Sequence, residues 1–173
     1  PDSSIEDRMD HPVVHVAFED AVAYCDWIGG RLPTESEWEF AARGGLADQP
    51  FIWGEAQIDE TRANTWNGRF PDRNTAADGY VRTAPVGRYP ANGYGLLDMG
   101  GNVWEWCHDR YGKYPSGSQR DPKGPDSGSY RVLRGGSWSN VARDVRAANR
   151  FGHTAGNRYG GLGFRPARSL PAN

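Results

Sequence analysis

The chain has 173 residues, a formal charge of −2 and a pI of about 6.1, and it contains no basic run or stripe. Nucleic-acid binding therefore has no electrostatic support, and we expect no nucleic-acid partner. No apolar stretch approaches the roughly 18 residues that cross a bilayer, so no membrane span is expected. The 23 Gly and 12 Pro, together with seven Trp, eight Tyr and six Phe, indicate an ordered, loop-rich domain whose aromatic side chains pack long connections.

The length fits a single domain, which we place at residues 11–168. A loose polar lead-in at 1–10 precedes it, and a short tail at 169–173 follows it. No signal peptide is recognised at the beginning of this sequence, and a signal at the native N-terminus would permit export or surface display. The sequence therefore leaves the compartment open.

Two short helices are predicted in the first quarter of the chain. After a brief alternation at 11–16, which indicates a short strand, apolar residues recur at helical spacing over 17–28, and Gly29 ends this segment. A second helix begins at Thr34, which is followed three residues later by Glu37 in a capping box. Cys25 lies on the apolar side of the first helix, where a small buried hydrophobic role is expected.

From Leu46 onward no helical period continues. Short apolar fragments alternate with Gly, Pro, Asn and Asp, which predicts short strands and long ordered loops; these fragments are 51–54, 83–86, 93–96, 130–134 and 162–165. No internal repeat or linker interrupts them. The pattern predicts one α+β domain with two short helices, a small twisted antiparallel sheet and long irregular loops.

Six segments stand out by their order and spacing: 11–16 (HPVVHV), 31–39 (RLPTESEWE), 92–96 (NGYGL), 101–106 (GNVWEW), 134–138 (RGGSW) and 163–165 (GFR). As an ordered set they resemble the sulfatase-modifying factor family, whose best-known member is formylglycine-generating enzyme. The resemblance runs from about residue 10 to residue 168 and implies a variant of the C-type lectin fold. Family domains usually carry a further strand and helix before the point where this chain begins, so we expect the N-terminal part of the domain to be missing here. The sequence is then a fragment, or the missing part is a separate chain; the alternative is a minimal version of the domain.

The resemblance also implies two calcium sites. One would be formed by the side chains of Asn64 and Asp78 with the carbonyl groups of Thr65 and Tyr80. The other would be formed by the side chains of Asp98 and Glu105 with the carbonyl groups of Gly101 and Val103. Carboxylate and carbonyl oxygens are the ligands that calcium takes. The alternative for the second set is that Asp98 caps a turn and Glu105 pairs with an arginine.

The family's catalytic cysteine pair has no counterpart in this chain. In the enzyme, two cysteines a few residues apart, after the Gly-Gly-Ser motif, bind copper and oxidise a substrate cysteine to formylglycine. The corresponding stretch here, 139–146 (SNVARDVR), contains no cysteine, and the chain's two cysteines are Cys25 and Cys107. Thiolates are the soft ligands that select Cu(I). We therefore expect no copper, no formylglycine generation and no catalytic residues.

The segment between the Gly-Gly-Ser-Trp and Gly-Phe-Arg motifs is rich in Asn, Arg, Gly and aromatic residues. It resembles the variable region of diversity-generating retroelement proteins, which display mutable positions on this scaffold. This resemblance predicts a non-catalytic display domain that binds an unknown protein or other ligand through its C-terminal loop face, 139–161. The residues assigned to this ligand-binding face are Trp138, Ser139, Asn140, Val141, Arg143, Asp144, Phe151, Gly152, His153, Asn157, Tyr159 and Gly160.

Two alternatives to display stay open. In the first alternative, the segment is a plain structural loop held by arginine hydrogen bonds, and the chain is a pseudoenzyme of the same family. Otherwise the chain is a metal-dependent oxidoreductase of the family with an unrecognised site.

Overall fold

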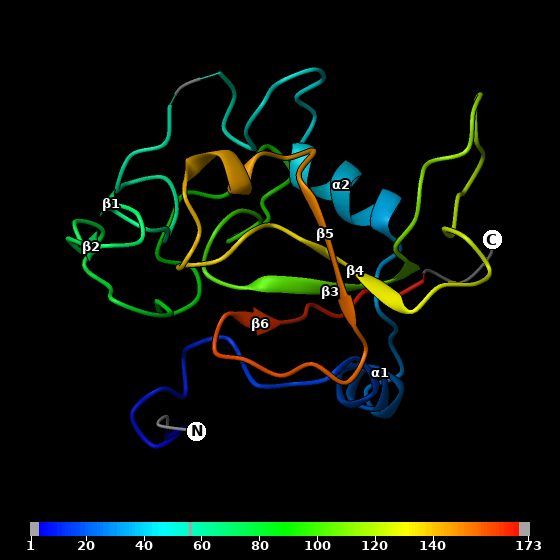
Figure 1. Ribbon diagram of the computed structural model, residues 1–173, viewed down its shortest axis with the longest axis horizontal. Coiled ribbons are helices and arrows are strands. Elements are labelled where there is room, and N and C mark those ends of the chain that lie inside the picture. Colours follow the sequence, from blue (N-terminus) through cyan, green and yellow to red (C-terminus); the bar gives the residue numbers. More distant parts are fainter. Residues whose placement is uncertain (1–3, 56, 170–173) are drawn as a thin grey trace.

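The computed structural model describes residues 4–55 and 57–169. Its centre is a four-stranded sheet with strand order β5-β4-β3-β6 (Figure 1). Neighbouring strands run antiparallel, except that β6 pairs with β3 in parallel. A separate two-stranded hairpin lies at the edge of the domain. The strands are β1 (Gly68–Arg69), β2 (Arg73–Asn74), β3 (Trp104–Arg110), β4 (Tyr130–Arg134), β5 (Arg150–Thr154) and β6 (Leu162–Gly163).

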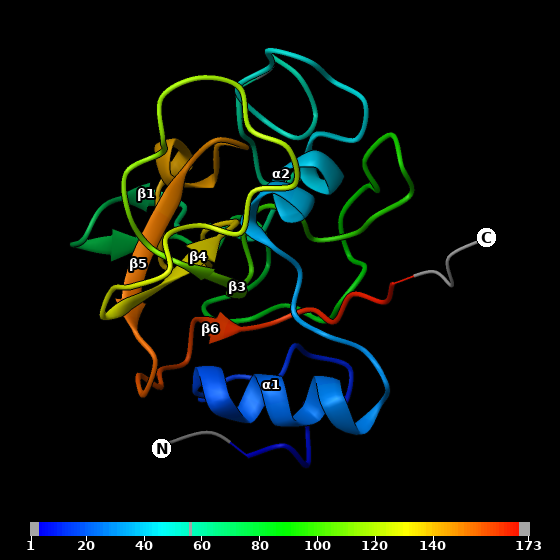
Figure 2. The ribbon, with the colours of Figure 1, turned by 90° about the vertical axis from the view of Figure 1, so that its right-hand side faces the viewer.

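The two helices lie on opposite faces of this sheet, as Figures 1 and 2 both show. Helix α1 spans Phe18–Trp27 and α2 spans Glu35–Arg43, close to the bounds that the sequence predicts. The predicted capping box is confirmed: the Glu37 amide donates to the Thr34 hydroxyl, and the Thr34 amide donates to the Glu37 carboxylate. Gly44 ends α2 in the left-handed conformation, which glycine adopts without steric cost.

Alternation along the strands produces two separate cores. In β3, Trp104 and Trp106 pack with Phe18, Ala21 and Cys25 on the α1 face. The intervening residues point the other way, because successive strand residues face opposite sides of a sheet. On that α2 face, Cys107 packs with Trp38, Ala42, Met99 and Val132.

The structure departs from the sequence prediction at several elements. Residues 11–16 form no strand, and His15 has a φ of 59°, which interrupts an extended chain. Strands β3 and β5 were not among the predicted fragments, and a 3-10 helix, η1 (Ala142–Val145), was not predicted either. Of the predicted lead-in and tail, residues 1–3 and 170–173 lie outside the described residues, and 4–10 consist of turns and irregular backbone.

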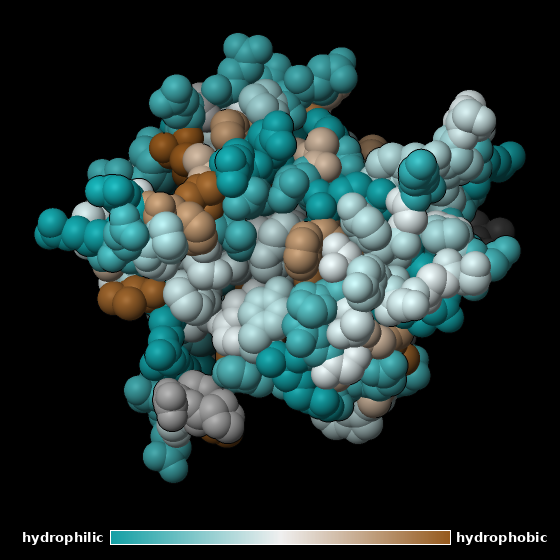
Figure 3. Space-filling view, viewed as in Figure 1, coloured by the Kyte–Doolittle hydropathy of each residue, from teal (hydrophilic) through white to brown (hydrophobic). Residues whose placement is uncertain are grey.

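The surface seen in Figure 3 is mostly hydrophilic, with hydrophobic residues in small separate groups. Within the described part of the chain, neither helix has the length and apolar character needed to cross a bilayer.

Candidate functional site

The segment after Gly135-Gly136 is held by hydroxyl, amide and indole groups. The Ser137 hydroxyl donates to Asn140 Oδ1 at 2.7 Å and lies 3.0 Å from the Ser139 hydroxyl. The Trp138 indole donates to the carbonyl of Gly160 at 3.0 Å, which joins this segment to the loop after β5. The carbonyl of Asn140 accepts from the amide of Trp66. These hydrogen bonds hold the segment in which the resemblance would place a cysteine pair.

The two cysteines cannot form a two-thiol centre. Cys25 is buried in the core on the α1 face and Cys107 in the core on the α2 face, so the sheet lies between them. Burial raises the pKa of both thiols, most strongly that of Cys107. A raised pKa keeps a cysteine in the thiol form, which is a poor metal ligand and nucleophile.

Part of the predicted ligand-binding face forms a row of rings on the α1 face of the sheet. The ring of Phe151 lies 5.8 Å from that of Trp104, the ring of His153 lies 6.0 Å from Phe151, and the ring of Tyr159 lies 6.1 Å from His153. These contacts follow from strand alternation in β5, which places Phe151 and His153 on one side. Trp138 is hydrogen-bonded to Gly160, the residue that follows Tyr159 in the chain.

Other members of the predicted face lie elsewhere. Gly152 points to the opposite face of the sheet, where an added Cβ would meet Tyr111 Cγ at 2.5 Å. Arg143 and Asp144 belong to η1, and Val141 precedes it as its N-cap. Asn157 lies in the turn after β5, where its amide donates to the carbonyl of Thr154. The sequence could not reveal this separation, because it depends on which way each strand residue points.

The first calcium set contains a buried oxygen without a protein partner. Asn64 is fully enclosed, and its Oδ1 accepts no hydrogen bond, whereas its Nδ2 donates to the carbonyl of Arg82. The Asp78 carboxylate accepts the amides of Thr65 and Tyr80, and burial raises its pKa. Buried polar atoms are rarely left unpaired, so an oxygen in this position has the character of a cation ligand.

The second calcium set is partly engaged by protein groups. Asp98 Oδ2 accepts the amide of Gly87, but its Oδ1 is buried without a partner, and burial raises the pKa of this carboxyl. The Glu105 carboxylate instead receives two hydrogen bonds from Arg165, at 2.6 and 2.7 Å, and one from the Trp38 indole. Asp98 therefore offers an open oxygen, while a guanidinium already neutralises Glu105.

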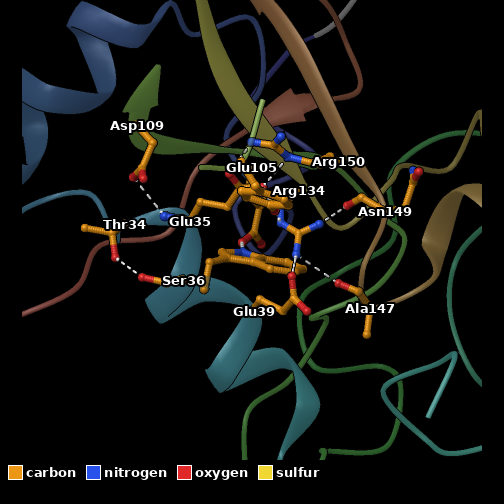
Figure 4. Close-up of polar contacts among 12 residues, drawn as sticks. Thr34, Glu35, Ser36, Glu39, Glu105, Asp109, Arg134, Ala147, Asn149 and Arg150 are labelled. Atoms are coloured by element: carbon orange, nitrogen blue, oxygen red, sulfur yellow. Dashed lines mark hydrogen bonds and ion pairs between the residues drawn. The ribbon is translucent and has the colours of Figure 1, made fainter. Parts of the chain in front are cut away.

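A third group of polar residues was not recognised from the sequence. On the α2 face, Glu35 receives two hydrogen bonds from Arg150 (Figure 4), at 2.7 and 2.5 Å. It receives one more from the Tyr114 hydroxyl. Arg134 is fully buried beside them, where it pairs with Glu39. These residues line or support a cavity of about 810 Å³. A signal for this cluster is hard to find in the sequence, because its members come from α2, β4, β5 and a loop.

Comparison with known proteins identifies the relationship. The family model described as "Sulfatase-modifying factor enzyme 1-like domain" matches residues 1–170. Formylglycine-generating enzyme of Streptomyces coelicolor is 49% identical over 95% of this chain and 55% of that protein. A mouse protein named inactive C-alpha-formylglycine-generating enzyme 2 is 45% identical over 98% of this chain and 53% of its own length. The chain thus spans about half the length of these relatives.

Among solved structures, Treponema denticola variable protein 1 superposes with a TM-score of 0.76 at 28% identity, over 90% of this chain and 70% of that chain. This likeness is weaker in sequence than the likeness to the enzymes, so the prediction of a diversified display domain is wrong. Several residues that suggested display are held by the scaffold itself: Asn140 binds Ser137, and Trp138 binds Gly160.

The family match, the identity to named relatives and the two-helix architecture with little regular secondary structure agree with one another. The chain belongs to the sulfatase-modifying factor family, that of formylglycine-generating enzyme, and has the family's C-type-lectin-like α+β fold.

Proposed function

We propose that this chain is a pseudoenzyme of the formylglycine-generating-enzyme family, a domain that does not itself oxidise cysteine. One observation carries the proposal: residues 137–165 contain no cysteine, and the chain's two thiols are buried in separate cores. Oxidation of a thiol by oxygen requires a redox centre, and the family's centre depends on soft sulfur ligands. The residues present therefore do not fit copper.

The naming of one relative supports the same assignment. The mouse protein that is 45% identical to this chain carries the word "inactive" in its name, so the family includes members described as having lost the activity. Within the described residues, no three His, Cys, Asp or Glu side chains gather closely enough to hold a metal ion.

The domain would keep calcium as a structural ion. Asn64 Oδ1 and Asp98 Oδ1 are buried oxygens without partners, and each belongs to one of the two predicted ligand sets. Calcium takes six to eight oxygens, including backbone carbonyls. In the first set Asn64 Oδ1 is the open side-chain oxygen, since both Asp78 oxygens accept backbone amides. At the second site Asp98 would be the main side-chain ligand because Glu105 is held by Arg165.

The test is a direct assay on the full natural protein. A peptide that carries the cysteine target of the Streptomyces coelicolor enzyme is incubated with this protein, Cu(I), oxygen and calcium, and aldehyde formation is followed by mass spectrometry. We expect no aldehyde and, after dialysis against a Cu(I) chelator, no retained copper. The Streptomyces coelicolor enzyme is the positive control. Turnover above the protein-free rate would overturn the proposal.

A further inference from the structure

A cavity of about 810 Å³ opens on the α2 side of the sheet, and it shares no residue with the segment 137–146. Helix α2, the loop at 112–125 and Arg150 of β5 form its boundary. Pockets that hold small organic ligands have volumes of about 300–1,000 Å³. The size of this cavity is therefore that of a ligand site, and an inference from it is independent of the pseudoenzyme assignment.

The floor of the cavity is rigid. The Glu35 carboxylate is almost fully enclosed and is fixed by Arg150 (Figure 4) and by the Tyr114 hydroxyl. Behind it, Arg134 is completely buried and donates to Glu39 and to the carbonyl of Ala147. Because these charges satisfy one another, the floor needs no ligand to neutralise it. It supplies a preorganised surface, which lowers the entropic cost of binding.

The walls are apolar and exposed. Phe40 is 69% exposed at the mouth, where its ring lies 5.5 Å from that of Tyr94. Tyr114 is 63% exposed, although its hydroxyl is bound to Glu35. Pro115 and Pro122 complete this side of the lining. Rings exposed in this way can cover the flat body of a ligand, and their burial is favourable.

The charges that remain unpaired at the rim are positive. The chain contains 18 arginines but two lysines, Lys113 and Lys123, and both line this cavity. The lining arginines are engaged, since Arg43 binds Glu39 and Arg150 binds Glu35. Within the described part of the chain, neither lysine has an ion-pair or hydrogen-bond partner among the contacts of the structure. Asp109, the remaining carboxylate of the lining, accepts the amide of Glu35.

We propose that this cavity binds a small organic anion with an aromatic or other apolar body. Lys113 and Lys123 attract the anionic group, and Phe40, Tyr114 and Pro115 cover the body. A neutral ligand of the same shape gains the apolar contacts without the attraction to the ammonium groups, and a cationic ligand is repelled. The site therefore discriminates by charge as well as by shape.

The two lysines also make the test selective. Reductive methylation with ¹³C-formaldehyde labels lysine side chains and keeps their charge, so every lysine label within residues 1–173 lies at this cavity. The probe is 2-naphthoate, compared with the neutral 2-naphthamide and the cationic 2-naphthylmethylamine. We expect 2-naphthoate to shift both lysine signals saturably, with an affinity about tenfold higher than that of 2-naphthamide, which corresponds to a modest charge attraction.

Variants separate the contribution of the lysine charges from that of the apolar wall. They are measured in the unmethylated protein, where binding is followed by the change in 2-naphthoate fluorescence. The double variant Lys113→Gln/Lys123→Gln should abolish the preference for naphthoate over naphthamide. The matched control Arg69→Gln/Arg168→Gln removes two exposed positive charges elsewhere and should leave it intact. Phe40→Ala should lower the affinity for both probes about tenfold. Phe70→Ala changes a residue that is 54% exposed outside the cavity, so it should leave both affinities unchanged.

Three results would overturn the proposal: no saturable shift of the lysine signals, equal affinity for the three probes, or unchanged binding in the double lysine variant. Since all substitutions are at exposed side chains, loss of folding is not expected to obscure the result, and urea unfolding of each variant verifies this.

Discussion

Arg150 of β5 binds both carboxylate oxygens of Glu35 at the beginning of α2, at 2.7 and 2.5 Å. This pair joins a strand to a helix that is 115 residues away in the sequence. The Arg150 guanidinium also donates to the carbonyl of Gly112 and lies 4.1 Å from the centre of the Tyr114 ring. One planar group thus fixes the helix, the strand and the cavity loop relative to one another.

Arg150→Lys should destabilise the fold by about 2 kcal/mol, because a lysine keeps the charge but cannot form the paired hydrogen bonds to a buried carboxylate. The matched control is Arg158→Lys. Arg158 is half exposed and donates to Asp20, so this change should cost less than about 0.5 kcal/mol. The measurement is the free energy of unfolding in urea. Equal losses in the two variants would contradict the structural role of the Arg150–Glu35 pair.

The capping box predicts a pH-dependent contribution from Glu37. Hydrogen bonds from Arg31, together with the Thr34 amide, lower the pKa of this carboxyl from 4.5 to about 2. A lowered folded-state pKa contributes stability above the unfolded-state value, and this stability is lost as the pH falls from about 4.5 toward 2. Glu37→Gln keeps the capping geometry and removes the charge.

The difference in unfolding free energy between the natural protein and Glu37→Gln should therefore be constant above pH 5 and shrink toward pH 2. Glu60→Gln, at an exposed residue, serves as the control. Because Glu37 is about half exposed, solvent screening keeps the effect small. A difference that grows on acidification would show that the charge does not stabilise the cap.

Calcium binding predicts that stability depends on the free calcium concentration. At about one hundred times the dissociation constant, one bound ion adds roughly 2.7 kcal/mol to the free energy of unfolding. Asp98→Asn should reduce this gain, because it removes a charge while preserving the side-chain shape and tolerating the φ of 55° at this position. Asp126→Asn, at an exposed residue, should retain the full gain. Identical unfolding curves with calcium and with chelator would exclude structural calcium.

A Tyr→Phe substitution should have opposite effects on stability at two positions, Tyr114 and Tyr89. The Tyr114 hydroxyl donates to Glu35, so Tyr114→Phe should cost about 1 kcal/mol. The Tyr89 hydroxyl is buried without a partner, and burial raises its pKa. Tyr89→Phe in calcium-free buffer should therefore leave stability unchanged or raise it by about 1 kcal/mol, since an unpaired buried group is removed. A marked loss in Tyr89→Phe would reveal a hydrogen bond to ordered water or an ion.

The helices could be predicted from the sequence because their signals are local. Thr34 and Glu37 form the capping box within the first turn of α2, and Gly44 ends the same helix. Strand β3 lacks the usual alternation, since all but two of its residues are buried through contacts on both faces. Strand β5 consists of Arg, Phe, Gly, His and Thr, and its partner β4 alone explains why it is extended.

The candidate sites likewise divide into those with a local sequence signal and those that depend on the tertiary fold. The loss of the cysteine pair is visible in the sequence, because it concerns residue types within one segment. The cavity beside Lys113 is invisible there, because α2, the loop at 112–125 and Arg150 meet only after the sheet has formed. The opposite orientations of Phe151 and Gly152 likewise depend on strand pairing, which residue composition does not encode.

Gly152 tests this tertiary fit most directly. A Cβ at this position would lie 2.5 Å from Cγ and 2.9 Å from Cβ of Tyr111, so the ring would have to move. Gly152→Ala should destabilise the fold by roughly 1–3 kcal/mol through overpacking. The double variant Gly152→Ala/Tyr111→Ala removes the obstructing ring, so its loss should be smaller than the sum of the two single losses by at least about 1 kcal/mol. Strict additivity in this double-mutant cycle, measured by urea unfolding, would mean that the alanine is accommodated by the backbone of β5 and that the Tyr111 ring does not set the residue type at 152.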